Sequence, residues 1–135
     1  MVAFFDTNVL LYALETGDKA ARARTVIDEG GSVSVQVMNE LVNALAGKYR
    51  RPWDQIEASR DDLLELVGLP RALTMATHLL AGTLVRDHRL HIYDALIVAS
   101  AIEAGCDTLY SEDMHAGWRH AGLTVVNPFG RGSGR

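Results

Sequence analysis

Short β-rich segments alternate with longer amphipathic segments along most of this chain, and this alternation constrains the fold more than any other feature. Apolar and β-branched runs predict strands at 2–5, 32–35, 71–75, 107–111 and 123–127. Helical spacing of apolar residues predicts helices at 18–30, 36–50, 53–68, 76–88 and 92–105. Because parallel strands need long crossover connections, this order predicts an α/β fold with a parallel sheet and helices on both faces.

The length and composition fit one globular domain. The chain has 135 residues, of which 48% are hydrophobic, which is sufficient for a core. We expect a domain at 1–128 and a disordered tail at 129–135, because the last six residues, GRGSGR, include no apolar side chain. No apolar run is long enough to span a membrane and no signal-peptide pattern is present, so we expect a cytoplasmic protein. The only cysteine, Cys106, is predicted to be a buried thiol.

The net charge of −4 argues against a protein that coats nucleic acid by bulk attraction. This objection weakens if several acids surround a metal cation, because local basic residues could then contact phosphates. The candidates for such contacts are Lys48, Arg50, Arg51, Arg86 and Arg89. Taken one at a time, each is better explained as an ordinary surface charge.

Acidic residues follow two of the predicted strands. Asp6 comes directly after the first strand, and the pair Glu112 and Asp113 follows the strand at 107–111. Because open parallel sheets bind ligands at the carboxyl ends of their strands, we expect these acids to meet at one edge. A helix cap is the alternative for Asp6, Thr7 and Asn8, whose side-chain oxygens accept hydrogen bonds from the N–H groups of a following helix.

Two further acids lie on predicted helices. Glu40 is opposite the apolar stripe of its helix, beside Gln36 and Asn43, and this position is typical of a glutamate that faces solvent. Asp94 is the only charged residue in the apolar stretch 92–102. An unpaired carboxylate on an apolar face is costly, so Asp94 indicates a partner or a metal ion. Capping of the helix is an equally weighted alternative for Asp94.

Taken together, these motifs closely resemble a known family. The stretches FFDTNVLLYAL, MNEL, YDALIVASAIEAGCDTLYSEDM and GLTVVNP are similar to those of PIN-domain ribonucleases of the VapC toxin type. The resemblance runs from about Val2 to Pro128, nearly the whole chain. Its most specific part is YDALIVASA followed by LYSEDM, because two acidic motifs occur there in the order and spacing of the family.

The resemblance implies a five-stranded parallel sheet, an Mg²⁺ or Mn²⁺ site and cleavage of RNA. It also implies an antitoxin protein that neutralises the enzyme, and a homodimer. Thr7, Asn8 and Glu112 are neighbours that could order the site, and Glu112 could also point into it. The implied catalytic and metal-binding acids are Asp6, Glu40, Asp94 and Asp113. Carboxylate oxygens suit Mg²⁺, which is a hard ion that usually keeps several water ligands.

Two other functions are weighed against this one. An inactive PIN-like module that only binds RNA or a protein partner would be expected to lose one of the four acids, and this chain keeps all of them. A phosphoryl-accepting receiver domain also gathers acids around Mg²⁺, but it expects a lysine late in the chain, and no lysine follows Lys48. None of the five histidines has the spacing of a zinc motif.

Overall fold

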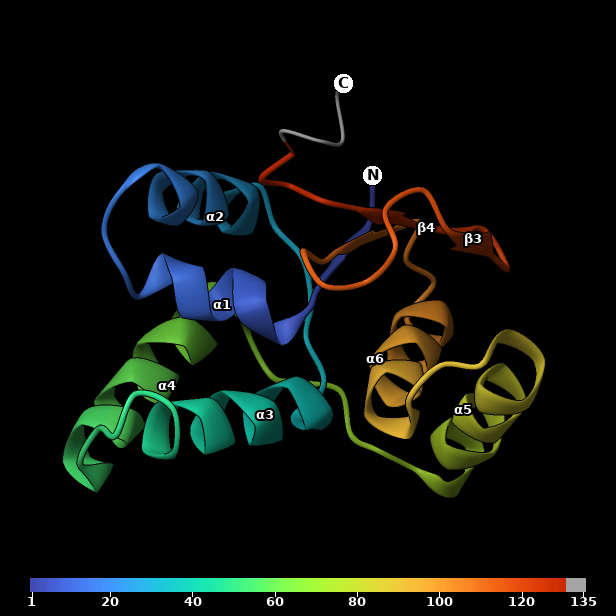
Figure 1. Cartoon of the computed structure of the whole chain (residues 1–135), viewed down its shortest axis with the longest axis horizontal. Helices are drawn as coiled ribbons and strands as arrows, with labels where there is room; N and C mark the ends of the chain where they lie inside the picture. The colour runs from blue at the N-terminus through green and yellow to red at the C-terminus, as the bar shows by residue number, and fades with distance from the viewer. Residues whose placement is uncertain (131–135) are drawn as a thin grey trace.

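The computed structural model describes residues 1–130 as a small sheet with helices around it (Figure 1). The strands of the described region are β1 (Ala3–Phe5), β2 (Thr108–Tyr110), β3 (Arg119–His120) and β4 (Leu123–Val126). Its helices are α1 (Thr7–Ala13), α2 (Asp18–Asp28), α3 (Val35–Ala46), α4 (Trp53–Val67), α5 (Met75–His88) and α6 (Ile92–Glu103). The predicted α/β class is confirmed, and all five predicted helices are present within a few residues of their expected bounds.

The sheet has the strand order β1-β2-β4-β3. β2 lies in the middle, where Leu109 pairs in parallel with Phe4 of β1 and Val125 of β4. β3 is antiparallel to β4 and joins it through a tight turn at Ala121 and Gly122, both with positive φ. The prediction of five parallel strands is therefore wrong in number, since the described chain has four strands and the short edge strand β3 runs the other way.

The segment 32–35 explains the missing strand. Its main chain exchanges hydrogen bonds with β1 at Ser32, through Phe5 N to Ser32 O (2.9 Å) and Ser32 N to Ala3 O (3.0 Å). Only one residue later it turns to Arg71, whose N–H donates to Val33 O (2.9 Å). Because its hydrogen bonds are divided between two neighbours before α3 begins, each pairing is an isolated parallel bridge and neither extends into a ladder. The predicted strand at 71–75 is reduced to the bridge at Arg71, because its partner segment enters α3 at Val35 and its own Thr74 already caps α5.

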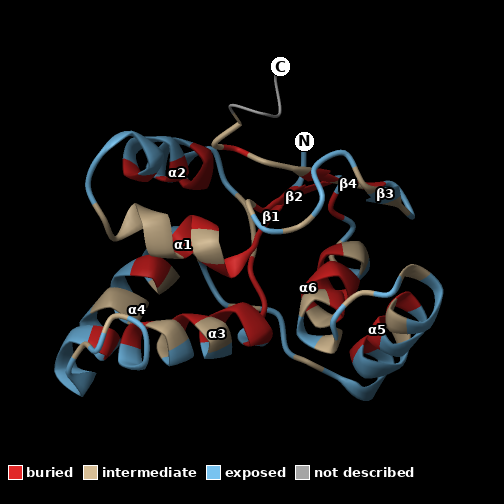
Figure 2. Cartoon of the chain, in the orientation of Figure 1, coloured by how far each residue is buried: buried red, intermediate tan, exposed pale blue. Residues whose placement is uncertain are grey.

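Two groups of helices pack around the sheet. α1 contacts α2 and α3, and α4 contacts α2 and α3, while α5 and α6 pair with each other. Figure 1 shows these two groups on opposite sides of the strands, with α3 reaching across to α6. Figure 2 shows the buried residues on the strands and on the inward sides of the helices. Phe4, Phe5, Ile97 and Leu109 are fully buried, so the core lies against the sheet as the alternating pattern predicts.

Three other expectations concern single segments. Cys106 is buried, as predicted. Phe129 packs edge-on against Tyr12, with ring centroids 4.8 Å apart, so ordered structure continues past Pro128. The rest of the predicted tail, residues 131–135, lies outside the described region. Within residues 1–130, no helix combines the length and the apolar character that crossing a membrane requires.

Candidate functional site

Asp6 is held rigidly at the junction of β1 and α1. It follows the last residue of the strand, and its own N–H donates to Tyr110 O on β2 (2.9 Å). One carboxylate oxygen accepts from the Thr7 N–H (2.7 Å) and the other from the Ser111 hydroxyl (2.7 Å). Asp6 is thus the N-cap of α1, as the capping interpretation predicts. Capping does not exclude a functional role, because the charges of Glu40 and Asp94 also act on this carboxylate.

The folded structure disfavours the negatively charged form of Asp6. Its side chain is only 5% exposed, and this burial, together with the charges of Glu40 and Asp94, raises its pKa to about 6. The hydrogen bonds from Ser111 and Thr7 oppose the shift but do not cancel it. None of the ion pairs in the described region includes Asp6, Glu40 or Asp94. The site is therefore a partly buried group of carboxylates without a cationic side chain.

Glu40 is engaged by neighbours on two helices, contrary to the expectation of an ordinary solvent-facing glutamate. Its Oε1 accepts a hydrogen bond from the Thr7 hydroxyl (2.8 Å), and its Oε2 accepts one from Gln36 Nε2 (3.0 Å). Thr7 therefore bridges two acids, since its main-chain N–H is bonded to Asp6 and its hydroxyl to Glu40. This arrangement fits the predicted role of Thr7 in ordering the site.

Asp94 lies in the first turn of α6 and does not cap that helix. The cap is His91, whose Nδ1 accepts from the Tyr93 N–H (3.2 Å). Partial burial raises the pKa of Asp94, and the charges of Glu40 and Asp113 add to the shift while His91 opposes it. The structure thus favours an acid that faces other acids over the capping alternative.

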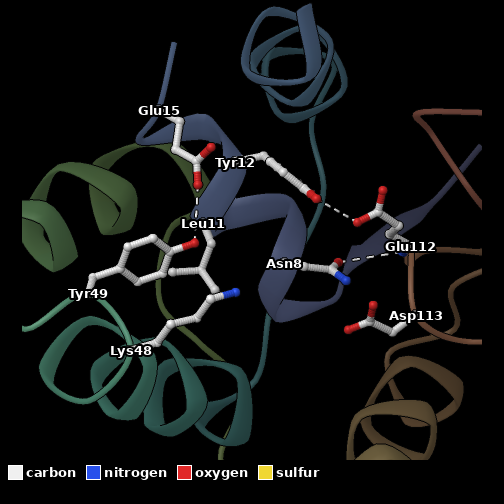
Figure 3. Close-up of a pocket in the computed structure, with 8 residues that line it drawn as sticks. All are labelled: Asn8, Leu11, Tyr12, Glu15, Lys48, Tyr49, Glu112 and Asp113. Atoms are coloured by element: carbon white, nitrogen blue, oxygen red, sulfur yellow. Dashed lines mark hydrogen bonds between the residues drawn. The ribbon is translucent and has the colours of Figure 1, made fainter. Parts of the chain in front are cut away.

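The neighbours Glu112 and Asp113 point in different directions (Figure 3). The Glu112 carboxylate accepts from the Tyr12 hydroxyl (2.7 Å) and pairs with Lys19 (2.5 Å). Burial would raise the pKa of Glu112, but the bonds from Lys19 and Tyr12 bring it below its usual value. Asp113 is exposed and acts electrostatically on Asp94. Of the two, Asp113 is therefore the one whose charge acts on another of the predicted acids, while Glu112 is paired with Lys19.

Two supporting residues were missed from the sequence. Ser111 fixes Asp6 and also accepts from the Met114 N–H (3.1 Å), which shapes the loop that carries Asp113. Gln36 fixes Glu40. The spacing of four residues between Gln36 and Glu40 is a signal for a contact on one helix face, and Ser111 could have been found as the polar residue that ends β2.

The donor set suits a hard divalent cation, although the acids do not form a ready-made cage. Among the described residues, no group of three or more His, Cys, Asp and Glu side chains is arranged to hold a metal ion directly. The carboxylates nevertheless repel one another and have no cationic partner, so a bound cation would stabilise their charged forms. Mg²⁺ usually retains several waters and can be held through them, which is compatible with acids that do not form a direct cage.

A pocket of about 200 Å³ adjoins Asp113 between α1 and the end of α3 (Figure 3). Asn8 Oδ1 accepts from the Glu112 N–H (3.5 Å), whereas Asn8 Nδ2 is buried with no hydrogen-bond partner in the described structure. A buried donor without a partner is unusual and often marks a ligand site or an ordered water. Lys48 lines the pocket and its amino group points inward.

Residues 3–117 match the family model described as the PIN domain. Among curated proteins, no similar sequence is found. Several solved structures share the fold.

The toxin–antitoxin complex from Klebsiella pneumoniae has a TM-score of 0.71 at 22% identity and covers 93% of this chain and 97% of its own. VapBC2 from Rickettsia felis, bound to a DNA fragment from its promoter, has a TM-score of 0.68 at 19% identity with the same coverage. VapC20 from Mycobacterium tuberculosis, a sarcin-ricin loop cleaving toxin, has a TM-score of 0.62 at 18% identity and covers 82% of this chain and 89% of its own.

Proposed function

Because the chain belongs to the PIN-domain family, we propose that it is a metal-dependent endoribonuclease and the toxin of a toxin–antitoxin pair. The observation that carries this proposal is the buried Asp6 carboxylate, which meets Glu40 and Asp94 but no cationic side chain. A fold that keeps such a costly group at the carboxyl end of a parallel strand fits a ligand-binding site rather than a purely structural one. The similar VapC20, a sarcin-ricin loop cleaving toxin, supports the same assignment.

Four acids would hold the metal, directly or through water: Asp6, Glu40, Asp94 and Asp113. When bound, Mg²⁺ or Mn²⁺ supplies the charge that activates a water molecule and stabilises the leaving oxygen in phosphodiester hydrolysis. The chain supplies orientation. Ser111 and Thr7 fix both oxygens of Asp6, while Gln36 and Thr7 fix both oxygens of Glu40, so two carboxylates are positioned before ligands arrive.

RNA would approach the acids through the pocket beside Asp113. Lys48 is the only Lys or Arg among the residues that line this pocket. The other lysine of the chain, Lys19, is already bonded to Glu112 and Tyr12. Lys48 is therefore the cation best placed to bind a phosphate of the RNA strand and offset the repulsion between that strand and the acids.

An antitoxin partner is supported by the two toxin–antitoxin complexes that share the fold. Carboxylates without a cationic partner would accept charge-assisted hydrogen bonds from an inserted arginine or lysine, and this is the mode of inhibition that the site favours. A homodimer is proposed from the family resemblance, as is Mg²⁺ with Mn²⁺ as a substitute.

The test is cleavage of RNA by the purified protein with Mg²⁺ and with EDTA. We expect cleavage that needs the metal and leaves 5′-phosphate and 3′-hydroxyl ends, because water would be the nucleophile. Asp6→Asn should abolish cleavage while the protein stays folded, and the matched control Asp62→Asn, on the exposed surface of α4, should leave it intact. Cleavage that persists in EDTA, or products with 2′,3′-cyclic phosphates, would refute the proposed chemistry. Expression without the partner protein should halt bacterial growth.

A further inference from the structure

A second hollow adjoins the acids, between α3 and α6. Its volume is about 340 Å³, and it is lined by Gln36, Asn39, Glu40, Asn43 and Tyr93. The first four come from one face of α3, and Tyr93 comes from the first turn of α6, where the two helices are in contact (Figure 1). Because Glu40 is one of its lining residues, this hollow shares a side chain with the candidate active site.

Tyr93 presents an aromatic ring to water. It is 54% exposed, although it belongs to α6, the helix with the most buried face in the fold. Its ring lies against the His91 ring, with centroids 5.1 Å apart and planes tilted by 43°, so one side is supported. An exposed and supported ring beside an active site is suited to stack on a planar group.

The α3 side of the hollow is lined by carboxamides. Asn39 and Asn43 are exposed, lie one helical turn apart, and have no side-chain hydrogen bond within the described region. Gln36 differs from them, because it is buried and bonded to Glu40. Each carboxamide can donate and accept at once, which is the property that matches the edge of a nucleobase.

The lining also argues against two other ligands. The described residues of the hollow include no Lys or Arg, so a phosphate would find no cation there and a repelling carboxylate at Glu40. They include no aliphatic side chain either, so the hollow does not fit the apolar anchor of a protein partner. A polar, planar group such as a nucleobase remains the best match.

We propose that this hollow is a base-recognition subsite for single-stranded RNA, in which Tyr93 stacks on one base and Asn39 and Asn43 bind its edge. The inference rests on the proposed ribonuclease function and adds the residues that select the sequence at the cleavage point. Single-stranded RNA is the fitting substrate because its bases are free to leave the stack and meet an aromatic ring.

The test measures binding rather than cleavage. Fluorescence anisotropy in EDTA would follow the full chain binding labelled homopolymers of A, C and U, each about ten nucleotides long. We expect Tyr93→Ala to weaken binding of the preferred probe by about 5- to 100-fold, and Tyr93→Phe, which keeps the ring, to change it by less than about twofold. Asn39→Ala and Asn43→Ala should reduce the differences in affinity between probes. The control is Trp53→Ala on α4, which removes an aromatic residue of the same 54% exposure outside the hollow.

Three results would overturn the subsite: no binding of any probe by the wild-type protein, wild-type binding by Tyr93→Ala, or an equal loss in Trp53→Ala. Parallel cleavage assays with Mg²⁺ separate this inference from the proposed function. Binding that depends on Tyr93 without any cleavage would keep the subsite and reject the nuclease. Cleavage by a protein whose RNA binding does not depend on Tyr93 would keep the nuclease function and reject the subsite.

Discussion

Replacing Asp6 with asparagine should stabilise the metal-free protein at neutral pH while abolishing its activity. The folded state raises the pKa of Asp6 from 3.8 to about 6, so the folded chain binds this proton more tightly than the unfolded chain does. The stability associated with the proton is fully present below about pH 3.8 and is lost as the pH rises through about 6. Asparagine cannot ionise, so the variant does not lose this folding stability as the pH rises.

The size of the effect follows from the shift. A difference of about two pKa units corresponds to about 3 kcal/mol of unfolding free energy above pH 6. Asparagine has one acceptor oxygen where Asp6 accepts bonds from both Thr7 and Ser111, and the poorer bonding costs about 1 kcal/mol. Asp6→Asn should therefore gain about 2 kcal/mol at about pH 8. At about pH 4.5 only about 1 kcal/mol of the penalty has developed, so the net gain should be about zero.

Urea denaturation in EDTA, followed by circular dichroism at these two pH values, measures both free energies of unfolding. The exposed Asp62→Asn variant is the control and should match the wild type at both. Equal stability of wild type and Asp6→Asn at the higher pH would contradict this prediction, because the ionised Asp6 carboxylate would then not destabilise the folded state. A gain that is the same at both pH values would also refute it, because ionisation would not be the cause.

Four further predictions concern other residues of the site. Asp94→Asn should raise the melting temperature in EDTA and shrink the stabilisation gained on adding Mg²⁺, as seen by differential scanning fluorimetry; coincident melting curves under both conditions would remove Asp94 from the site. Thr7→Val should lower cleavage about 10- to 100-fold by freeing Glu40, whereas Thr7→Ser should restore it. Glu112→Gln should leave the response to Mg²⁺ near that of the wild type, and a loss as large as that of Asp94→Asn would place Glu112 among the metal ligands. Lys48→Met should reduce the slope of log affinity for RNA against log salt concentration by about 0.7, because one phosphate contact would be lost. An unchanged slope would show that Lys48 does not contact a phosphate.

The sequence predicted the acids at strand ends better than it predicted their surroundings. Asp6 and Asp113 could be found because a parallel sheet brings the carboxyl ends of its strands to one edge, whatever the details of packing. Glu40 could not be assigned in this way, because its position on α3 is that of an ordinary surface glutamate. Its bond to Thr7 joins residues 33 positions apart and exists only because α1 packs against α3.

Secondary structure was likewise predicted correctly where the signal is local and incorrectly where it depends on tertiary contacts. Five of the six helices of the described region were predicted because the spacing of apolar residues is a local signal, whereas α1 was considered only through the capping alternative for Asp6. The segments 32–35 and 71–75 were predicted as strands from their composition, but a strand also needs a neighbour along its length. Which neighbour each N–H meets is decided by the tertiary fold, and here the hydrogen bonds are divided between β1 and Arg71.

The central position of β2 has a consequence for the order of events during protein synthesis. β1 leaves the ribosome well before its sheet partner β2, because the register pairs Ala3 with Thr108. At about 5–20 residues per second, several seconds separate the synthesis of these two strands. Asp113 follows β2, so the proposed site of four acids cannot be complete on a nascent chain that stops short of Asp113. Under the proposed function, a chain that stops short of Asp113 would therefore be inactive.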